Sequence, residues 1–383
     1  MEIKSSSMNE YPLMELEQGI PLFYPFISPD AKNSINSSLE TRWIGQGPKV
    51  DYFEKAFKDK LTNNKELIAT GSGTDALHLA YILSDVGPGD EVITPVFTCT
   101  ATNLPILYQG AKPVFADIDP LTLNIDPNDV EHRITSKTKA IVAVDYGGIP
   151  ADYEKLSLIA KKYNLKLISD AAQSIGLKYQ NKFTSDIADF VIFSFQAIKT
   201  ITTADGGMLV MKDNKFLEKA KRIRWFGIDR AEKQKGTWEN DIYELGYKYQ
   251  MTDIGASLGL TGLKHLSSLK AQRKKLLNIY SNGIKNKKIK VIDYPAKDGT
   301  DVCPWICTLI VNDDRITLMK MLRNNGVESA QVHYRNDRYS VFGSKQNDLP
   351  KMDYIEDKYL VIPLHHKVTE NDALKICKLI NSY

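Results

Sequence analysis

Short runs of β-branched and other apolar residues alternate with helix-length segments between residues 66 and 210, and this alternation constrains the fold more than any other feature. It is typical of βα units that build a mainly parallel sheet covered by helices. Helices are predicted in the gaps, including 74–84, where apolar residues recur at helical spacing, and 152–163. The seven candidate strands are 66–70, 91–95, 112–117, 140–145, 165–170, 189–195 and 207–211. The sequence therefore predicts an α/β fold with a mainly parallel, seven-stranded sheet.

A change of composition after Asp253 predicts a second domain. Residues 254–280 are expected to form one long helix, and its basic second half favours a solvated face over a surface for an anionic ligand. The basic residues are Lys264, Lys270, Arg273, Lys274 and Lys275. Beyond this helix, strands such as 305–311 alternate with helices such as 315–325 and 371–380. We therefore expect a flexible N-terminal tail at 1–19, a large domain at 20–265 that includes an N-terminal arm at 20–47, and a small C-terminal α+β domain at 266–383.

Charge and cysteine usage exclude several classes of function. Lys and Arg (50) nearly balance Asp and Glu (47), so no overall field draws the chain to nucleic acid or to an anionic membrane. No run of about 18 apolar residues is present, and the first eleven residues lack the apolar core of a signal peptide. Four scattered cysteines favour a reducing compartment. The expected protein is cytoplasmic, with no nucleic-acid or membrane partner.

A glycine-rich segment lies between a predicted strand and a predicted helix. In Gly71-Ser72-Gly73-Thr74, free backbone N–H groups and the helix dipole favour a phosphate. With Ala76 the segment also fits a loose dinucleotide fingerprint, which leaves an NAD-dependent oxidoreductase open as an alternative. That fingerprint needs an acidic residue at the end of the next strand, whereas Glu91 begins that strand. A phosphate-bearing ligand is expected here, and a bare tight turn is the simpler alternative.

Two ionisable residues follow predicted strands. Asp170 lies at the carboxyl end of its strand, where open α/β sheets bind ligands, and its carboxylate suits a protonated ring nitrogen; a helix N-cap is the alternative. Lys199 follows the next strand and precedes hydroxyls and a glycine turn, which favours a desolvated amine that forms Schiff bases; alone it would be an ordinary surface lysine. A phosphate cradle, an acid and such a lysine are the parts of a pyridoxal 5′-phosphate (PLP) site.

With these parts in place, the chain resembles the DegT/DnrJ/EryC1/StrS family of sugar aminotransferases from about residue 20 to the C-terminus. The segments that carry the resemblance are WIGQGP (43–48), GSGTDALHLA (71–80), GDEVITPVFTCTAT (89–102), DAAQSIG (170–176), the SFxxxK segment ending at Lys199, DGG (205–207) and GYKYQMTDIGASLGL (246–260). The resemblance implies a PLP-dependent aminotransferase of fold type I. Because sites of this fold type lie at a dimer interface, it also implies a homodimer with shared active sites.

The resemblance implies roles for individual residues. Lys199 would form the internal aldimine with PLP and move the proton between the cofactor's C4′ atom and the substrate carbon. Asp170 would pair with the ring nitrogen, and Gln173 would lie near the ring's 3-oxygen. The phosphate would be held by Gly73, Thr74, Asp75 and the Ser194 hydroxyl. Lys199 stands where the family's dehydratases carry a histidine, so transamination is favoured.

Two positions depart from the family pattern. Lys248 stands where relatives usually carry an asparagine that reaches the phosphate of the neighbouring subunit, and we expect Lys248 to substitute for it. Cys99 stands where many relatives carry an aromatic residue that stacks on the cofactor ring. A thiol packs there without stacking, so we expect Cys99 to line the cofactor site without acting as a nucleophile.

The resemblance favours L-glutamate as amino donor and a nucleotide-linked keto-deoxysugar as acceptor, in deoxyamino sugar and polysaccharide biosynthesis. Substrate contacts are expected from Trp43 and from the loop at 332–339, whose candidates are His333, Tyr334, Arg335 and Arg338. A small keto-phosphate as acceptor, a PLP-binding regulator without turnover and a plain polar loop at 332–339 are the open alternatives. Adjacent histidines at 365 and 366 point apart on a strand, so no metal site is expected.

Overall fold

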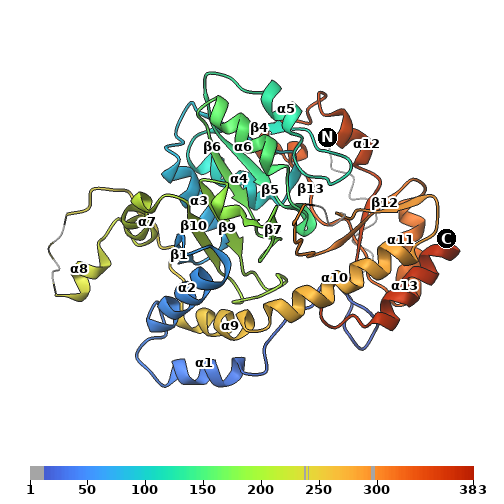
Figure 1. The fold of residues 1–383 in the computed structure, drawn as a ribbon, viewed down its shortest axis with the longest axis horizontal. Helices are drawn as coiled ribbons and strands as arrows, with labels where there is room; N and C mark the ends of the chain where they lie inside the picture. Colours follow the sequence, from blue (N-terminus) through green and yellow to red (C-terminus); the bar gives the residue numbers. More distant parts are fainter. Residues whose placement is uncertain (1–12, 237–238, 240, 295–297) are drawn as a thin grey trace.

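A seven-stranded sheet forms the centre of the computed structural model, which describes residues 13–236, 239, 241–294 and 298–383. Its strands are β1 (Glu66–Thr70), β2 (Glu91–Pro95), β4 (Lys112–Ala116), β5 (Thr138–Val144), β6 (Lys166–Asp170), β9 (Phe190–Ser194) and β10 (Gly207–Met211). They lie in the order β1-β10-β9-β6-β5-β2-β4 (Figure 1). β10 runs antiparallel to both of its neighbours, β1 and β9, and the other neighbouring pairs of this sheet are parallel. The predicted α/β fold with a mainly parallel sheet is confirmed, and the predicted strands lie within two residues of the observed ones.

Alternate residues of the strands pack into two hydrophobic cores on opposite faces of the sheet. In β5, Ile141 and Ala143 belong to one core, whereas Ala140 and Val142 belong to the other. The first face is covered by α2 (Pro48–Leu61), α6 (Tyr153–Lys162) and α9 (Asp253–Leu263), and the second by α3 (Gly73–Leu83), α4 (Thr100–Tyr108) and α7 (Leu217–Arg224). Strands covered on both faces need apolar side chains at nearly every position, which explains the continuous apolar runs in the sequence.

The C-terminal part of the chain forms a smaller layer beside this body (Figure 1). Its antiparallel sheet contains β11 (Ile289–Val291), β12 (Cys307–Val311) and β14 (Tyr359–Ile362), which share a hydrophobic core with α10 (Leu266–Gly283), α11 (Arg315–Asn324) and α13 (Glu370–Ser382). The remaining elements include α1 (Ala31–Leu39), β3 (Phe97–Thr98), α5 (Pro127–His132), β7 (Lys178–Tyr179), β8 (Lys182–Phe183), α8 (Arg230–Gln234), β13 (Tyr334–Arg335) and α12 (Pro350–Ile355). The predicted division at 265/266 falls just before α10, and the division into domains stays a prediction.

The long helix predicted at 254–280 is wrong as one element, because the chain forms α9 and α10 with a turn between them. At this turn the His265 N–H bonds to the Gly262 carbonyl at 2.9 Å. The Leu263 carbonyl accepts instead from Lys60 Nζ on α2, at 2.8 Å. The lysine thus satisfies a carbonyl at the C-terminus of α9, which would otherwise have no partner within the helix.

The structure describes only part of the expected N-terminal tail but all of the expected arm. Of the predicted tail at 1–19, residues 1–12 lie outside the described residues, whereas Met14 is buried. The arm continues along the C-terminal layer, where Ile20 bridges to Val327 and the Pro21 carbonyl lies 2.8 Å from His365 Nε2. Within the described ranges, none of the helices is long and apolar enough to cross a membrane.

Candidate active site

The carboxyl ends of the central strands bring the predicted catalytic groups to one edge of the sheet. Asp170 is the last residue of β6, and the register pairs it with Val144 on β5 and with Ile192 on β9. Ser194 ends β9, and the chain reaches Lys199 five residues later. Parallel strands all end at the same edge, so the topology itself assembles the site that the sequence predicted.

Asp170 is a buried carboxylate that lacks a cationic partner. Asp170 is 4% exposed, and its side chain accepts hydrogen bonds from Thr102 Oγ1 at 2.8 Å and from the Ala172 N–H at 3.1 Å. Burial raises the pKa of this carboxyl, and the hydrogen bonds and Lys199 partly offset the rise. Among the described side chains, no Lys, Arg or His forms an ion pair with it. A buried charge without a partner is costly, so the site fits a ligand that brings a positive charge, as a protonated pyridine nitrogen does.

Gln173 and His333 lie together, although 160 residues separate them in the chain. Gln173 Oε1 accepts a hydrogen bond from the Gly147 N–H at 2.7 Å, and its Nε2 lies 3.3 Å from His333 Nε2. His333 has a left-handed backbone, with φ of +68°. Burial, with a smaller contribution from the charge of Lys199, lowers the pKa of His333 to about 3. The imidazole is therefore neutral at physiological pH and acts here only as a hydrogen-bonding group.

Lys199 occupies a desolvated position beside an aromatic ring. Burial lowers the pKa of its amine, while Cys99 and Asp170 oppose that shift. Its Nζ lies 3.9 Å from the ring centroid of Trp305, a buried residue of the C-terminal layer. A lowered pKa makes an amine available as a nucleophile and base. Trp305 entered the sequence prediction only as the start of a strand, and nothing in the local sequence indicated its contact with Lys199.

The predicted phosphate cradle lies at the N-terminus of α3. The Ser72 side chain caps this helix by accepting from the Asp75 N–H at 3.0 Å, while the N–H groups of Gly73 and Thr74 have no partner inside the helix. A Cβ atom at position 73 would lie 2.9 Å from the Cβ of Ser194, so Gly73 lets the β9 end approach the helix. Burial raises the pKa of Asp75 to about 6. Backbone donors and a serine hydroxyl side by side fit a phosphate.

Cys99 and Lys248 occupy different surroundings. Cys99 is the N-cap residue of α4, is partly exposed and lies close enough to Lys199 to influence its pKa. Lys248 is exposed, and its Nζ lies 5.6 Å from the ring centroid of Phe226. Its predicted contact with a neighbouring subunit's phosphate stays a prediction.

Three of the predicted substrate residues, Trp43, Tyr334 and Arg338, are partly or largely exposed. Trp43 is partly buried beneath the guanidinium of Arg42, 5.0 Å from its ring centroid, and Tyr334 is 37% exposed. Arg338 is half exposed and pairs with Glu356. The predicted substrate contacts of Trp43, Tyr334, Arg338 and His333 stay a prediction.

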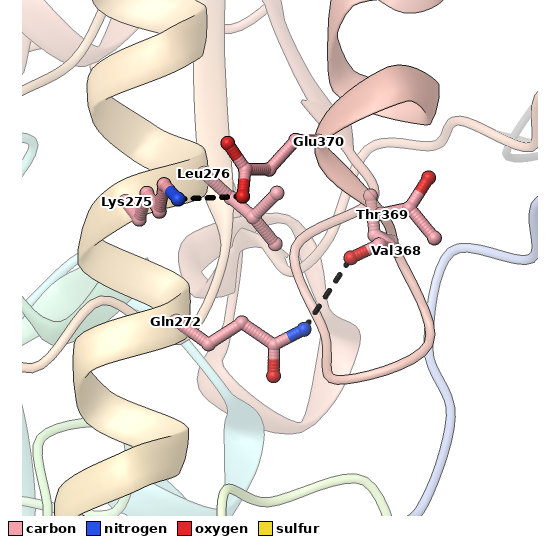
Figure 2. Close-up of a pocket in the computed structure, with 6 residues that line it drawn as sticks. All are labelled: Gln272, Lys275, Leu276, Val368, Thr369 and Glu370. Atoms are coloured by element: carbon pink, nitrogen blue, oxygen red, sulfur yellow. Dashed lines mark hydrogen bonds and ion pairs between the residues drawn. The ribbon is translucent and has the colours of Figure 1, made fainter.

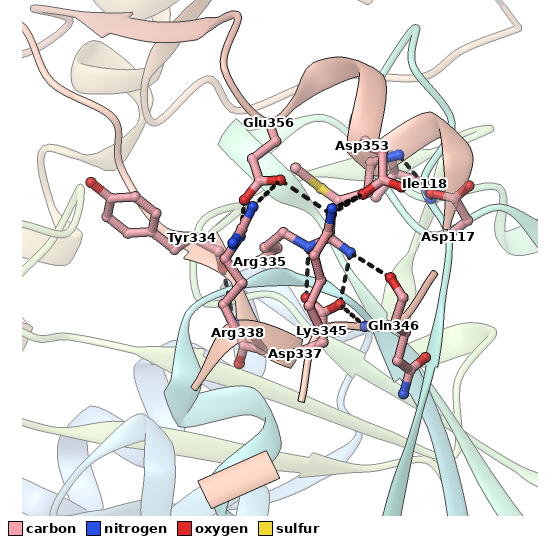
Figure 3. Close-up of polar contacts among 12 residues, drawn as sticks. Asp117, Ile118, Tyr334, Arg335, Asp337, Arg338, Lys345, Gln346, Asp353 and Glu356 are labelled. Carbon is pink, nitrogen blue, oxygen red and sulfur yellow. Dashed lines mark hydrogen bonds and ion pairs between the residues drawn. The ribbon is translucent and has the colours of Figure 1, made fainter. Parts of the chain in front are cut away.

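The structure places Arg335 in a buried ion cluster instead of at a substrate contact (Figure 3). Its guanidinium is fully buried and bonds both oxygens of Asp337 at 2.7 Å each, and it also pairs with Asp353 and Glu356. Each of its three nitrogens already has an acceptor, so none is free for a ligand. Sequence analysis could not separate Arg335 from Arg338, because both are arginines of one loop and only their long-range partners differ.

The basic residues of α10 do not form a free cationic surface. Lys270 and Lys274 pair with Asp301 at 2.7 and 2.9 Å, and Lys275 pairs with Glu370 at 2.5 Å (Figure 2). The pocket drawn in Figure 2 lies between α10 and α13, and its lining includes none of the predicted catalytic residues. Arg273 corrects the expectation of a solvated face, because it is buried on the side of α10 that packs inward.

Two residues of the site were missed by the sequence analysis in addition to Trp305. Thr102 holds Asp170, and Gly147 orients Gln173 through its N–H. Both residues lie far along the chain from the residues they contact, and the local sequence pattern does not predict such contacts. No group of three or more His, Cys, Asp or Glu within the described part of the chain is arranged to hold a metal ion.

Comparisons with known proteins agree with this geometry. The model of the DegT/DnrJ/EryC1/StrS aminotransferase family matches residues 25–381. The spore coat polysaccharide biosynthesis protein SpsC of Bacillus subtilis is 32% identical over 92% of this chain and 94% of its own. The PLP form of Spr1654 from Streptococcus pneumoniae has a TM-score of 0.88 at 29% identity, covering 95% of this chain and 98% of its own. The sugar aminotransferase CalS13 from Micromonospora echinospora has a TM-score of 0.89 at 29% identity, covering 95% and 99%.

These findings confirm the predicted family, fold type, enzyme class and cofactor. The site fits PLP on three independent observations: a buried carboxylate without a cation, a desolvated lysine and a helix N-terminus with a serine hydroxyl beside it. This chain belongs to the DegT/DnrJ/EryC1/StrS aminotransferase family and is a PLP-dependent aminotransferase.

Proposed function

We propose that this aminotransferase moves an amino group from L-glutamate to the keto group of a nucleotide-linked keto-deoxysugar. The observation that carries the proposal is the joint placement of Lys199, Asp170 and Gln173 at one sheet edge in a chain similar to a sugar aminotransferase and to a polysaccharide biosynthesis protein. The product would be a deoxyamino sugar for polysaccharide biosynthesis. A homodimer is part of the proposal.

When bound, PLP supplies an aldehyde and an electron-withdrawing ring. Asp170 would hold the protonated ring nitrogen, with Thr102 fixing the carboxylate. Gln173 would face the ring's 3-oxygen, oriented by the Gly147 N–H. Lys199 Nζ would take a proton from the substrate carbon and return it at C4′, which its lowered pKa favours.

The phosphate group would be held by the first turn of α3, through Gly73 and Thr74, and by the Ser194 hydroxyl. Asp75 contributes its backbone N–H to the Ser72 cap. A pKa of about 6 leaves its own carboxyl mostly ionised at neutral pH. Its carboxylate would repel a phosphate, so Asp75 supports the helix terminus and not the ligand.

A preference for a nucleotide-linked ketone over a small keto-phosphate is the first prediction. Purified enzyme with L-glutamate should aminate a nucleotide-linked keto-deoxysugar with a kcat/KM at least about 100-fold above that for a small keto-phosphate, because distant parts of a substrate supply binding energy to the reacting centre. Product formation is measured by mass spectrometry. The reverse preference would establish the keto-phosphate alternative, and no turnover of any ketone after a complete glutamate half-reaction would favour a regulator.

The homodimer is supported by an apolar surface on the segment that contains α8. This segment extends away from the central sheet (Figure 1), and it exposes Ile242, Tyr243 and Leu245 at 53%, 84% and 79%. Three large exposed apolar side chains within four residues of a projecting segment are typical of a surface that a partner covers. Lys248 comes soon after them in the chain and is itself exposed, so a second copy that buries this surface would also lie close to Lys248.

Subunit mixing tests both parts of this proposal. Lys199→Ala and Lys248→Ala should each lower activity, and their coexpression should restore about one quarter of the wild-type value, because half of the dimers are mixed and each carries one intact site. If Lys248 served its own subunit, every site in the mixture would lack one lysine and no activity would return. A monomeric mass by light scattering with full activity would reject the dimer.

A further inference from the structure

The indole of Trp305 is held in place from several directions. Its Nε1–H donates to the Ile198 carbonyl at 2.9 Å, and its backbone N–H donates to the Gly147 carbonyl at 2.8 Å. The Trp305 carbonyl accepts from Arg273 Nη1 at 2.8 Å. Phe23 of the N-terminal arm stacks on the ring, with centroids 5.4 Å apart and planes inclined by 22°. Trp305 is only 2% exposed, and both its indole N–H and its backbone are hydrogen-bonded. Its ring is therefore held in one orientation.

The amine of Lys199 lies on this ring instead of on a carboxylate. The Nζ atom is 3.9 Å from the Trp305 centroid, well inside the range of a cation–π interaction. Asp170 is near enough to influence the pKa of Lys199, yet the two form no ion pair in the described structure. Two other polar groups lie near the amine, the Cys99 thiol and the neutral imidazole of His333, and the positive charge of Lys199 disfavours protonation of that imidazole. The π face of Trp305 therefore offsets part of the free-energy cost of removing water from the Lys199 ammonium.

We propose that the face of Trp305 is a holding site for the amine of Lys199 while that amine is not bonded to the cofactor. The inference rests on the proposed role of Lys199 and makes Trp305 a positioning residue. An ammonium that paired with Asp170 would neutralise the carboxylate that the ring nitrogen needs. By holding the amine on a π face, Trp305 leaves the Asp170 carboxyl without an ammonium partner, free to meet the ring nitrogen, and it keeps Lys199 within the site.

The test replaces Trp305 by tryptophans with one to four fluorine atoms on the ring, which reduce the negative potential of the π face with little change of shape. The pKa of Lys199 is measured in the protein without PLP, from the pH dependence of its acetylation by trace acetic anhydride, quantified by mass spectrometry. We expect the pKa to fall stepwise, by about one unit at four fluorines, a tenfold change in the ratio of ammonium to amine. A pKa that stays constant across the series would overturn the proposal.

Fluorination at Trp225 is the matched control. That ring lies under the guanidinium of Arg230, at 5.5 Å, and it has no contact with Lys199 among the described interactions. It should leave the pKa of Lys199 unchanged. Borohydride reduction of the PLP-loaded wild type, followed by peptide mapping, tests the role of Lys199 separately. A modified Lys199 with a flat fluorine series rejects only the holding site, whereas an unmodified Lys199 rejects its role as the PLP lysine.

Discussion

Replacing Lys199 with alanine is expected to lower the rate of transamination by at least about 1,000-fold, because the variant loses both the nucleophile that anchors the cofactor and the base that moves the proton. The amine of Lys199 is desolvated, close to Asp170 and in contact with the ring of Trp305. The near-visible absorbance of the purified variant should lack the band of a protein-bound Schiff base. Addition of L-glutamate, which bleaches that band in the wild type, should cause no bleaching.

The Lys199→Ala variant should still bind PLP reversibly, since the first turn of α3, Ser194 and Asp170 remain. Lys155→Ala is a matched control, because this lysine is exposed on α6 and, among the described residues, forms an ion pair with Asp152 alone, at 3.1 Å. It should keep wild-type colour and rate. A coloured Lys199→Ala protein that still turns over glutamate would show that another residue carries the cofactor.

The parts of the site that follow from topology were predictable from the sequence. Asp170 and Ser194 each end an apolar strand, and the ends of neighbouring strands meet at one edge. Gly73 begins a helix directly after another strand. These positions depend on the period of the apolar residues and on turn residues, both of which are local properties of the sequence.

The parts that depend on long-range side-chain contacts were not predictable. Arg335 and Arg338 lie three residues apart in a polar loop, but only the first is enclosed by acidic side chains that the fold brings together. The carbonyl that ends α9 is bonded by Lys60, about 200 residues earlier in the chain. Trp305 meets Lys199 only because the C-terminal layer packs against the sheet edge. The local sequence around each of these residues does not predict its long-range contact partner.

Asp170→Asn is expected to change activity and stability in opposite directions. An amide cannot hold the ring nitrogen in its protonated form, so the ring withdraws electrons less strongly and kcat should fall by about 100- to 1,000-fold. Burial raises the folded-state pKa of Asp170. The folded protein without PLP therefore binds more protons than the unfolded chain, and this carboxyl lowers the free energy of unfolding as pH rises through its pKa. Without PLP at neutral pH, the variant should melt at a higher temperature than the wild type.

The opposite signs separate a cofactor-binding role of Asp170 from a structural one. If Asp170 served only as a helix N-cap or as a partner of Thr102, its replacement would lower the melting temperature and leave the rate per folded molecule near the wild-type value. Asp152→Asn provides the comparison, because Asp152 is an N-cap on α6 whose side chain accepts from the Lys155 N–H at 3.1 Å, and it lies outside the site. That change should lower stability slightly and leave kcat unchanged. A loss of kcat in Asp170→Asn together with a gain of stability without PLP would show that the fold keeps this carboxylate unpaired for the positive charge of the cofactor.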